Sequence, residues 1–139
     1  MNQISDEDRA LAQGVERCTA TGSDFNHAAH VQLARFYLVQ HGFEEGALRF
    51  ERALKGFAAH LGVPGKFHAT ITRAFLVLID DGLQKSPRDE GWNGFRARQR
   101  AMLDGGSSLL STYYTTRRLN SSKARSEFMQ PDLRPLPGL

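Results

Sequence analysis

Two histidines three residues apart, His27 and His30, are the clearest candidates for chemistry in this sequence. They lie in a segment, 24–42, whose apolar spacing predicts a helix. At about 100° per residue, both histidines fall in the same arc of roughly 80° as Tyr37, and apolar side chains flank that arc. We therefore expect two imidazoles on the face of this helix that packs against the rest of the protein.

A third histidine, His68, occupies a similar place on a second predicted helix at 66–79, which follows a Pro-Gly turn. Thr72 lies on the same apolar face of this helix, about one turn after His68. If the apolar faces of the two helices meet, five side chains converge on one cavity: His27, His30, His68, Tyr37 and Thr72. Tyr113 and Tyr114 are adjacent, so only one of them can face inward, and we expect one to close the rim of this cavity.

Proton transfer is the first chemistry that this cluster favours. An imidazole titrates near neutral pH, so a half-buried histidine can take or give a proton there. Two histidines at one helix start disfavour double protonation, which would leave one as a base and the other as an acid. With His27, His30 and His68 as catalytic residues, Tyr37 and Thr72 would position the substrate or stabilise a developing oxyanion. This interpretation needs no cofactor.

The same three residues, His27, His30 and His68, could instead bind a divalent metal such as zinc or iron. No carboxylate accompanies them, because on a helical wheel Asp80 and Asp81 lie roughly 120° and 140° from His68. A di-iron site, which takes several inward-facing carboxylates, is therefore not predicted. A structural role is the remaining alternative, in which each imidazole only bonds a nearby carbonyl or hydroxyl group.

The composition is typical of a soluble single-domain protein, with 139 residues of which 40% are hydrophobic and 24% are charged. The single Cys18 excludes a disulfide framework within the chain and fits a reducing compartment. The first residues are acidic and polar, unlike a signal peptide, and no apolar run reaches about 18 residues. We therefore expect a cytoplasmic protein that does not bind membranes.

The net charge of +3 comes mainly from arginine and lysine residues in the second half of the chain. They do not form the dense basic face, interleaved with aromatic residues, that nucleic-acid-binding proteins use. We therefore expect a small-molecule substrate rather than a nucleic acid as the partner. Phe36 and Val39 fall on the polar side of the first histidine helix, which suggests a second buried surface and favours a homodimer.

The elements that must position the histidines are helical almost throughout. Besides the two histidine helices, helical spacing covers 44–61 and 4–19, and Ser5 and Asp8 are placed as a capping box at the start of the latter. A Gly-Ser loop is expected at 104–108. These features predict an all-α, single-domain bundle of five to seven helices. The chain divides into an N-terminal helix extension (1–23), a helical core domain (24–130) and a Pro-rich C-terminal tail (131–139).

The histidine spacing resembles that of a widespread family of uncharacterised small bacterial helical proteins. The likeness rests on two motifs, FxHxxHxxLA at residues 25–34 and K[FY]HxTxT at residues 66–72. It continues through the tyrosine pair to Pro131-Asp132 and so covers most of the chain. In that family an acidic residue often follows the second-motif histidine, where this chain has Ala69. The resemblance implies a helical fold and marked histidine positions, but no single activity.

These patterns favour a small cytoplasmic enzyme of specialised metabolism that performs histidine-mediated acid–base chemistry on a small organic substrate. Condensation, cyclisation, isomerisation and hydrolysis all require proton transfers of this kind. Two alternatives remain open at this point. One is a metal-dependent enzyme or metal-binding protein that uses the same histidines, and the other is a ligand-binding or interaction module without catalysis.

Overall fold

The computed structural model describes residues 2–138, except for the side chains of residues 105–107. These residues form eight α-helices and two short 3-10 helices, and no strand occurs among them. The elements are α1 (Asp6–Glu16), α2 (His27–His41), α3 (Phe43–His60), η1 (Pro64–Lys66), α4 (Ala69–Gln84), α5 (Trp92–Arg98), α6 (Arg100–Gly105), η2 (Gly106–Thr112), α7 (Thr116–Leu119) and α8 (Ser122–Ser126). The predicted all-α fold is confirmed. The helix count exceeds the expected five to seven because the C-terminal third folds into several short helices.

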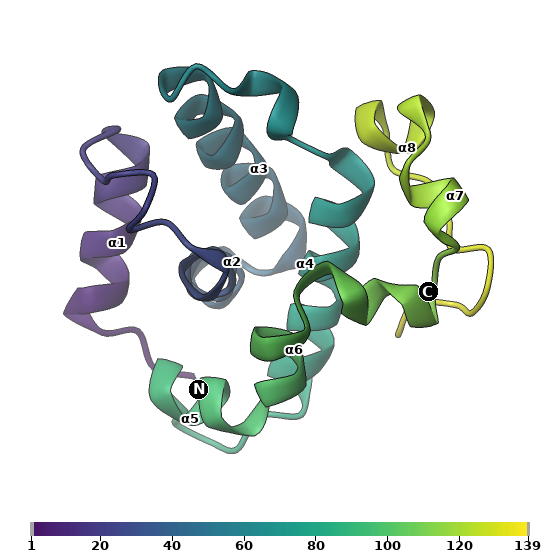
Figure 1. Ribbon diagram of the computed structural model, residues 1–139. Helices are drawn as coiled ribbons and strands as arrows, with labels where there is room; N and C mark the ends of the chain where they lie inside the picture. The colour runs from purple at the N-terminus through teal and green to yellow at the C-terminus, as the bar shows by residue number, and fades with distance from the viewer. Residues whose placement is uncertain (1, 139) are drawn as a thin grey trace.

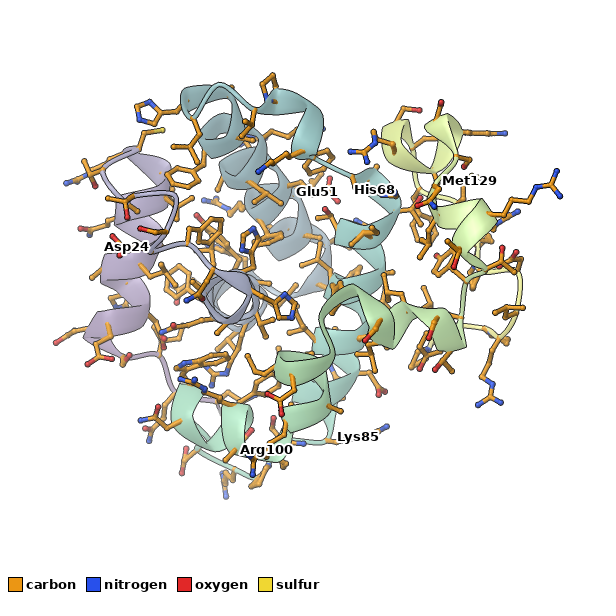
Figure 2. All side chains as sticks on the ribbon, in the orientation of Figure 1. Asp24, Glu51, His68, Lys85, Arg100 and Met129 are labelled. Carbon is orange, nitrogen blue, oxygen red and sulfur yellow. The ribbon has the colours of Figure 1, made fainter. Side chains whose placement is uncertain are left out.

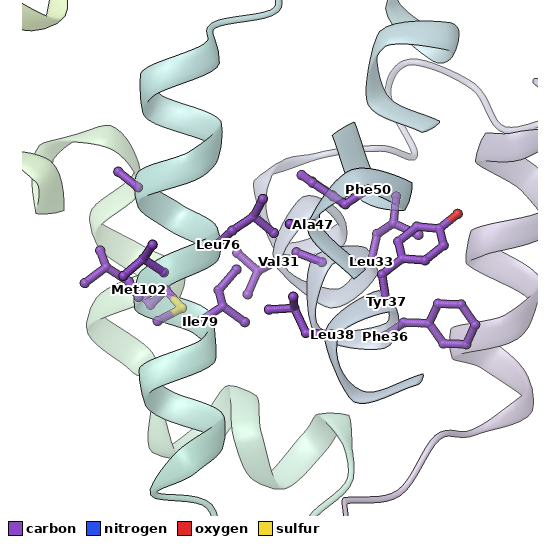
Figure 3. Close-up of a cluster of buried hydrophobic side chains, with 14 of the residues drawn as sticks. Val31, Leu33, Phe36, Tyr37, Leu38, Ala47, Phe50, Leu76, Ile79 and Met102 are labelled. Atoms are coloured by element: carbon purple, nitrogen blue, oxygen red, sulfur yellow. The ribbon is translucent and has the colours of Figure 1, made fainter. Parts of the chain in front are cut away.

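Four of the other helices pack around α2. Figure 1 shows α2 end-on, with α1, α3, α4 and α6 around it. Val31, Leu76 and Ile79 are buried between α2 and α4, whereas Phe36 and Tyr37 extend from the side of α2 that faces α1 (Figure 3). Because neighbouring helices cover α2 on several sides, it buries much more than one apolar stripe.

Local capping residues define the ends of the long helices. The predicted capping box at the start of α1 is confirmed, since the Ser5 side chain accepts a hydrogen bond from the backbone N–H of Asp8 and the Asp8 side chain accepts one from the Ser5 N–H. Asn26 caps α2 by accepting a hydrogen bond from the N–H of Ala29 at 2.9 Å. Gly42, with a φ of 79°, ends α2 and leads directly into α3. With this one-residue link, α2 and α3 pack closely against each other.

The second buried face of α2 is covered by this chain itself. Phe36 is buried although it lies opposite the histidines, and α1 packs against this side of α2. Gln32 donates a hydrogen bond to Asp8 of α1 at 2.8 Å, and the buried Arg35 donates to the carbonyl oxygens of Gln3 and Glu90. The surface from which a homodimer was expected is thus an internal interface, and the N-terminal extension is part of the common core.

The C-terminal third is anchored to the start of α4. The Thr70 hydroxyl donates a hydrogen bond to the carbonyl of Glu127 at 2.9 Å and accepts one from the N–H of Met129 at 3.0 Å. The expected loop at 104–108 is helical, as the end of α6 and the start of η2. The Pro-rich tail also packs on the protein, because Leu136 is completely buried. This arrangement places α7 and α8 beside α4 (Figure 1).

α4 runs across the molecule between its two capping residues, His68 and Lys85. Figure 2 places His68 at the start of this helix and Lys85 at its other end. Of the helices described, none is both long and apolar enough to cross a membrane.

Candidate functional site

A cavity of about 460 Å³ lies between α2, α3 and α4. Eight of the residues that line it are apolar, among them Phe50 and Ile79. The remaining lining residues are the three polar ones: His27, His30 and Thr72. A mainly apolar cavity with a few convergent polar groups is the usual form of a small-molecule site.

His30 presents an unbonded ring nitrogen. Its Nδ1 lies 2.8 Å from the carbonyl oxygen of Asn26, and because a carbonyl can only accept, Nδ1 carries the hydrogen of the neutral ring. Nε2 then carries a lone pair and makes no hydrogen bond to any residue the structure describes. Among residues 2–138, Arg35 is the only residue with side-chain nitrogens that are both fully buried and without a hydrogen bond. Nε2 of His30 has no hydrogen bond either, so it is not fully buried and is accessible.

The surroundings of His30 disfavour its protonation. Its ring stacks on Phe25, with the ring centroids 3.9 Å apart. Burial lowers the pKa of His30 below its ordinary value of 6.5, the bond to the Asn26 carbonyl partly opposes this, and the neighbouring His27 lowers the pKa further. At neutral pH His30 is therefore an uncharged proton acceptor in apolar surroundings.

His27 is fixed in the opposite tautomer. Its Nε2 lies 3.0 Å from the carbonyl oxygen of Met102, so Nε2 donates and Nδ1 carries the lone pair. The ring meets that of Phe75 edge-on, with the centroids 5.5 Å apart. Thr72 completes the polar set, and its hydroxyl has no hydrogen-bond partner in the described chain. Two imidazole lone pairs and one hydroxyl are thus available to a bound molecule.

His68 is placed differently from the prediction. It precedes the first residue of α4, where its Nδ1 accepts a hydrogen bond from the N–H of Ile71 at 3.1 Å. Its Nε2 donates to the carbonyl of Leu119 at 2.8 Å, so both ring nitrogens are occupied. His68 does not line the 460 Å³ cavity. Its bonds cap α4 and hold the end of α7, which is a structural use of the imidazole.

Tyr37 also lies away from the histidine cavity. Its hydroxyl donates a hydrogen bond to Glu16 of α1, and it lines a separate cavity between α1 and α3. Burial raises the pKa of Tyr37 well above its ordinary range, and the bond to Glu16 adds to this effect. Tyr37 lies at the edge of the helical arc that contains His27 and about 15 Å further along the axis. At that position the edge of the arc faces α1 rather than α4.

The tyrosine pair does not close the rim of the cavity. Tyr114 is buried and donates a hydrogen bond to the carbonyl of Met129 at 2.7 Å, while Tyr113 is partly exposed. Burial raises the pKa of Tyr114 to about 12. Neither residue lines the histidine cavity. Their role in the structure is to hold the C-terminal segment.

The three histidines do not form a metal site. In the part of the chain that the structure describes, no three histidine, cysteine, aspartate or glutamate side chains lie close enough together to bind one ion. His27 and His30 share the cavity, but the third predicted ligand, His68, has both nitrogens engaged elsewhere. The three-histidine ligand set that the sequence suggested is therefore not assembled in this structure.

Two functional features were missed from the sequence. Phe25 directly precedes the cap of α2, and its stacking on His30 follows the hydrophobic-staple spacing, with an imidazole in the place of the usual apolar side chain. That spacing could have been read in the sequence. The Met102 carbonyl, which fixes the tautomer of His27, comes from 75 residues away and left no such signal.

Comparisons of this chain with protein-family models, with curated proteins and with solved structures found no match. The function is therefore argued from the geometry of the cavity.

Proposed function

We propose that this protein is a small-molecule enzyme in which His30 acts as a general base, with Thr72 and His27 as positioning groups. The observation that carries the proposal is that His30 lines an apolar cavity with Nδ1 anchored to the Asn26 carbonyl and Nε2 left without a hydrogen bond in the described chain. An anchored ring with a depressed pKa is unprotonated and correctly oriented before the substrate binds.

The polar groups of the cavity define the complementary substrate. The free nitrogens of His27 and His30 are acceptors in their neutral forms, so the substrate must offer a hydroxyl or an acidic C–H group. The apolar lining favours an aromatic or aliphatic body around that group. No lysine, arginine, aspartate or glutamate of residues 2–138 lines this cavity. An apolar ketone that loses a proton from the carbon beside its carbonyl group meets these requirements, as does an enol that loses its hydroxyl proton.

The protonated state of His30 would be short-lived. Burial and the nearby His27 both disfavour the imidazolium form. The start of a helix, which carries a partial positive charge, acts in the same direction at His30. A proton taken from one position of the substrate would therefore be returned readily to another. Isomerisation and cyclisation are the reactions that such a proton transfer serves best.

The catalytic proposal can be tested with 2-tetralone, an apolar bicyclic ketone whose C–H groups beside the carbonyl exchange in D₂O. We expect the protein to accelerate this exchange, measured by NMR, and His30→Gln to reduce the acceleration by roughly 10²–10⁴-fold. The rate should rise with pH through the pKa of His30, which burial holds below 6.5, and level off above that pKa, because the neutral ring is the active form. His60→Gln, on an exposed histidine of α3, is the matched control.

The second candidate function is ligand binding without catalysis, which the apolar lining would also support. The pair 2-naphthol and 2-methoxynaphthalene separates it from the first, since only the naphthol can donate to His30. We expect a preference of about twofold to tenfold for the naphthol, lost in His30→Gln. If the naphthol preference is found without any acceleration of tetralone exchange, the protein is a binding module. If neither is found, His30 is not a proton acceptor for ligands.

A further inference from the structure

A second cavity, of about 510 Å³, adjoins the first along the start of α4. The two share four lining residues: His30, Leu54, Ile71 and Thr72. Since the same side chains line both, the two cavities adjoin there, with His30 and Thr72 at the junction, and we infer that they can act as one space. We call the two cavities together the passage. A ligand much longer than one bicyclic ring could lie along it.

One end of the passage is positively charged. Among the residues that the structure describes, Lys66 is the only lysine, arginine, aspartate or glutamate that lines either cavity, and it belongs to the second one. Lys55 of α3 adds to it, because its Nζ lies 4.8 Å from the ring centroid of Phe67, which also lines the second cavity. Arg125 donates a hydrogen bond to the carbonyl of Gly65, the neighbour of Lys66, at 2.7 Å. In the described part of the chain, no aspartate or glutamate lines the passage.

The other end has no lysine or arginine among its described lining residues to attract an anion. There the available nitrogens of His27 and His30 are lone pairs, which would face the oxygen lone pairs of a carboxylate. The walls of the first cavity are otherwise apolar apart from Thr72. A molecule with one anionic end and an apolar body should therefore prefer the direction that places its charge at Lys66.

We propose that the passage binds an elongated apolar carboxylate, with its carboxylate group at Lys66 and Lys55 and its apolar body extending past His30 into the first cavity. This inference rests on the proposed function, since it names the substrate class of the same site. It places the reacting position of the substrate at the junction, some distance from the carboxylate, where His30 and Thr72 meet it. The carboxylate then anchors the substrate and takes no part in the proton transfer.

The test uses decanoate and 1-decanol below the critical micelle concentration, with affinities from isothermal titration calorimetry. Decanoate should bind more tightly than decanol, and octanoate about 15-fold more weakly than decanoate, since each buried methylene contributes about fourfold. Lys66→Met should weaken decanoate binding by about twofold to fivefold, and Lys55→Met/Lys66→Met by more, with decanol unchanged. Lys85→Met, at the other end of α4 (Figure 2), should change neither.

The direction of binding is tested by NMR. Nuclear Overhauser effects from the terminal methyl group of decanoate should reach Phe75 and Ile79, which line the first cavity. If decanol binds as tightly as decanoate, or the lysine variants have no effect on decanoate, the carboxylate does not bind at Lys66 and Lys55. If the terminal methyl contacts only residues of the second cavity, the two cavities do not act as one passage. Tetralone exchange involves no carboxylate, so these failures are distinct from a failure of His30 as a base.

Discussion

The first turns of α2 and α4 each bring a histidine to the wall of the same passage, yet the protein uses the two rings differently. His68 bonds the N–H of Ile71 and the carbonyl of Leu119, so both of its nitrogens are occupied. His30 bonds only the carbonyl of Asn26 and keeps one nitrogen available. The comparison indicates that burial alone does not make a histidine a candidate base. The protein must also leave one ring nitrogen without a hydrogen bond, so that it can accept a proton from a ligand.

The largest expected effect is on stability at the start of α4. His68→Ala removes the cap of the helix and leaves the Leu119 carbonyl without its partner, so we expect a loss of about 2–4 kcal/mol in the free energy of unfolding. His30→Ala should cost only about 1 kcal/mol, because the Asn26 carbonyl keeps the backbone N–H of His30 as a donor. Urea denaturation of both variants measures the difference.

His68→Asn sharpens this comparison. Asparagine is a good helix cap but is too short to reach the Leu119 carbonyl, so it should recover about 1 kcal/mol of the loss. Equal costs for His68→Ala and His30→Ala would contradict the division between a structural and a functional ring. So would a His68→Asn variant as unstable as His68→Ala.

The second prediction concerns Phe25, which stacks on His30 and meets Phe57 edge-on at 5.3 Å. Phe25→Leu leaves an apolar side chain but uncovers part of the imidazole, so the pKa of His30 should move up toward its ordinary value. We expect a stability loss of about 1–2 kcal/mol. An NMR titration of the ring protons measures the pKa, and an unmoved value would show that Phe25 does not cause the burial effect.

The sequence was sufficient for the four long helices because their signals are local. Apolar spacing, the Ser5–Asp8 capping box, Asn26 and Gly42 place α1 to α4 within a few residues of their observed ends. The short helices of the C-terminal third carry weaker signals, such as the single capping residues Thr115 of α7 and Ser121 of α8. They depend on distant contacts, such as the bonds of Thr70 to Glu127 and Met129. Helices of four or five residues are not stable without contacts of this kind.

The site was predictable only in part, for a related reason. A helical wheel gives the direction of a side chain, and it correctly grouped His27 and His30 on one face with Thr72 opposite. It does not tell which neighbour covers that direction, so Tyr37 was assigned to the cavity although α1 covers it. His68 was misassigned because histidine is not among the usual capping residues.

The smallest expected effect, and the most direct measure of the available nitrogen, is a pH dependence of stability. The pKa of His30 is lower in the folded protein than the value of about 6.5 in the unfolded chain. Between these two values the unfolded chain binds more protons, so the free energy of unfolding rises with pH in that window and levels off above it. The His30→Gln variant lacks this pH-dependent contribution to the free energy of unfolding. The stability of the original protein relative to His30→Gln should therefore be greatest above pH 6.5, fall as the pH drops through the window, and stay constant below the pKa of the folded state. Urea denaturation from about pH 5 to 8, with His60→Gln as the exposed control, measures this difference. A difference that does not change with pH would mean that the fold does not keep the ring neutral, and His30 would then lose its advantage as a base.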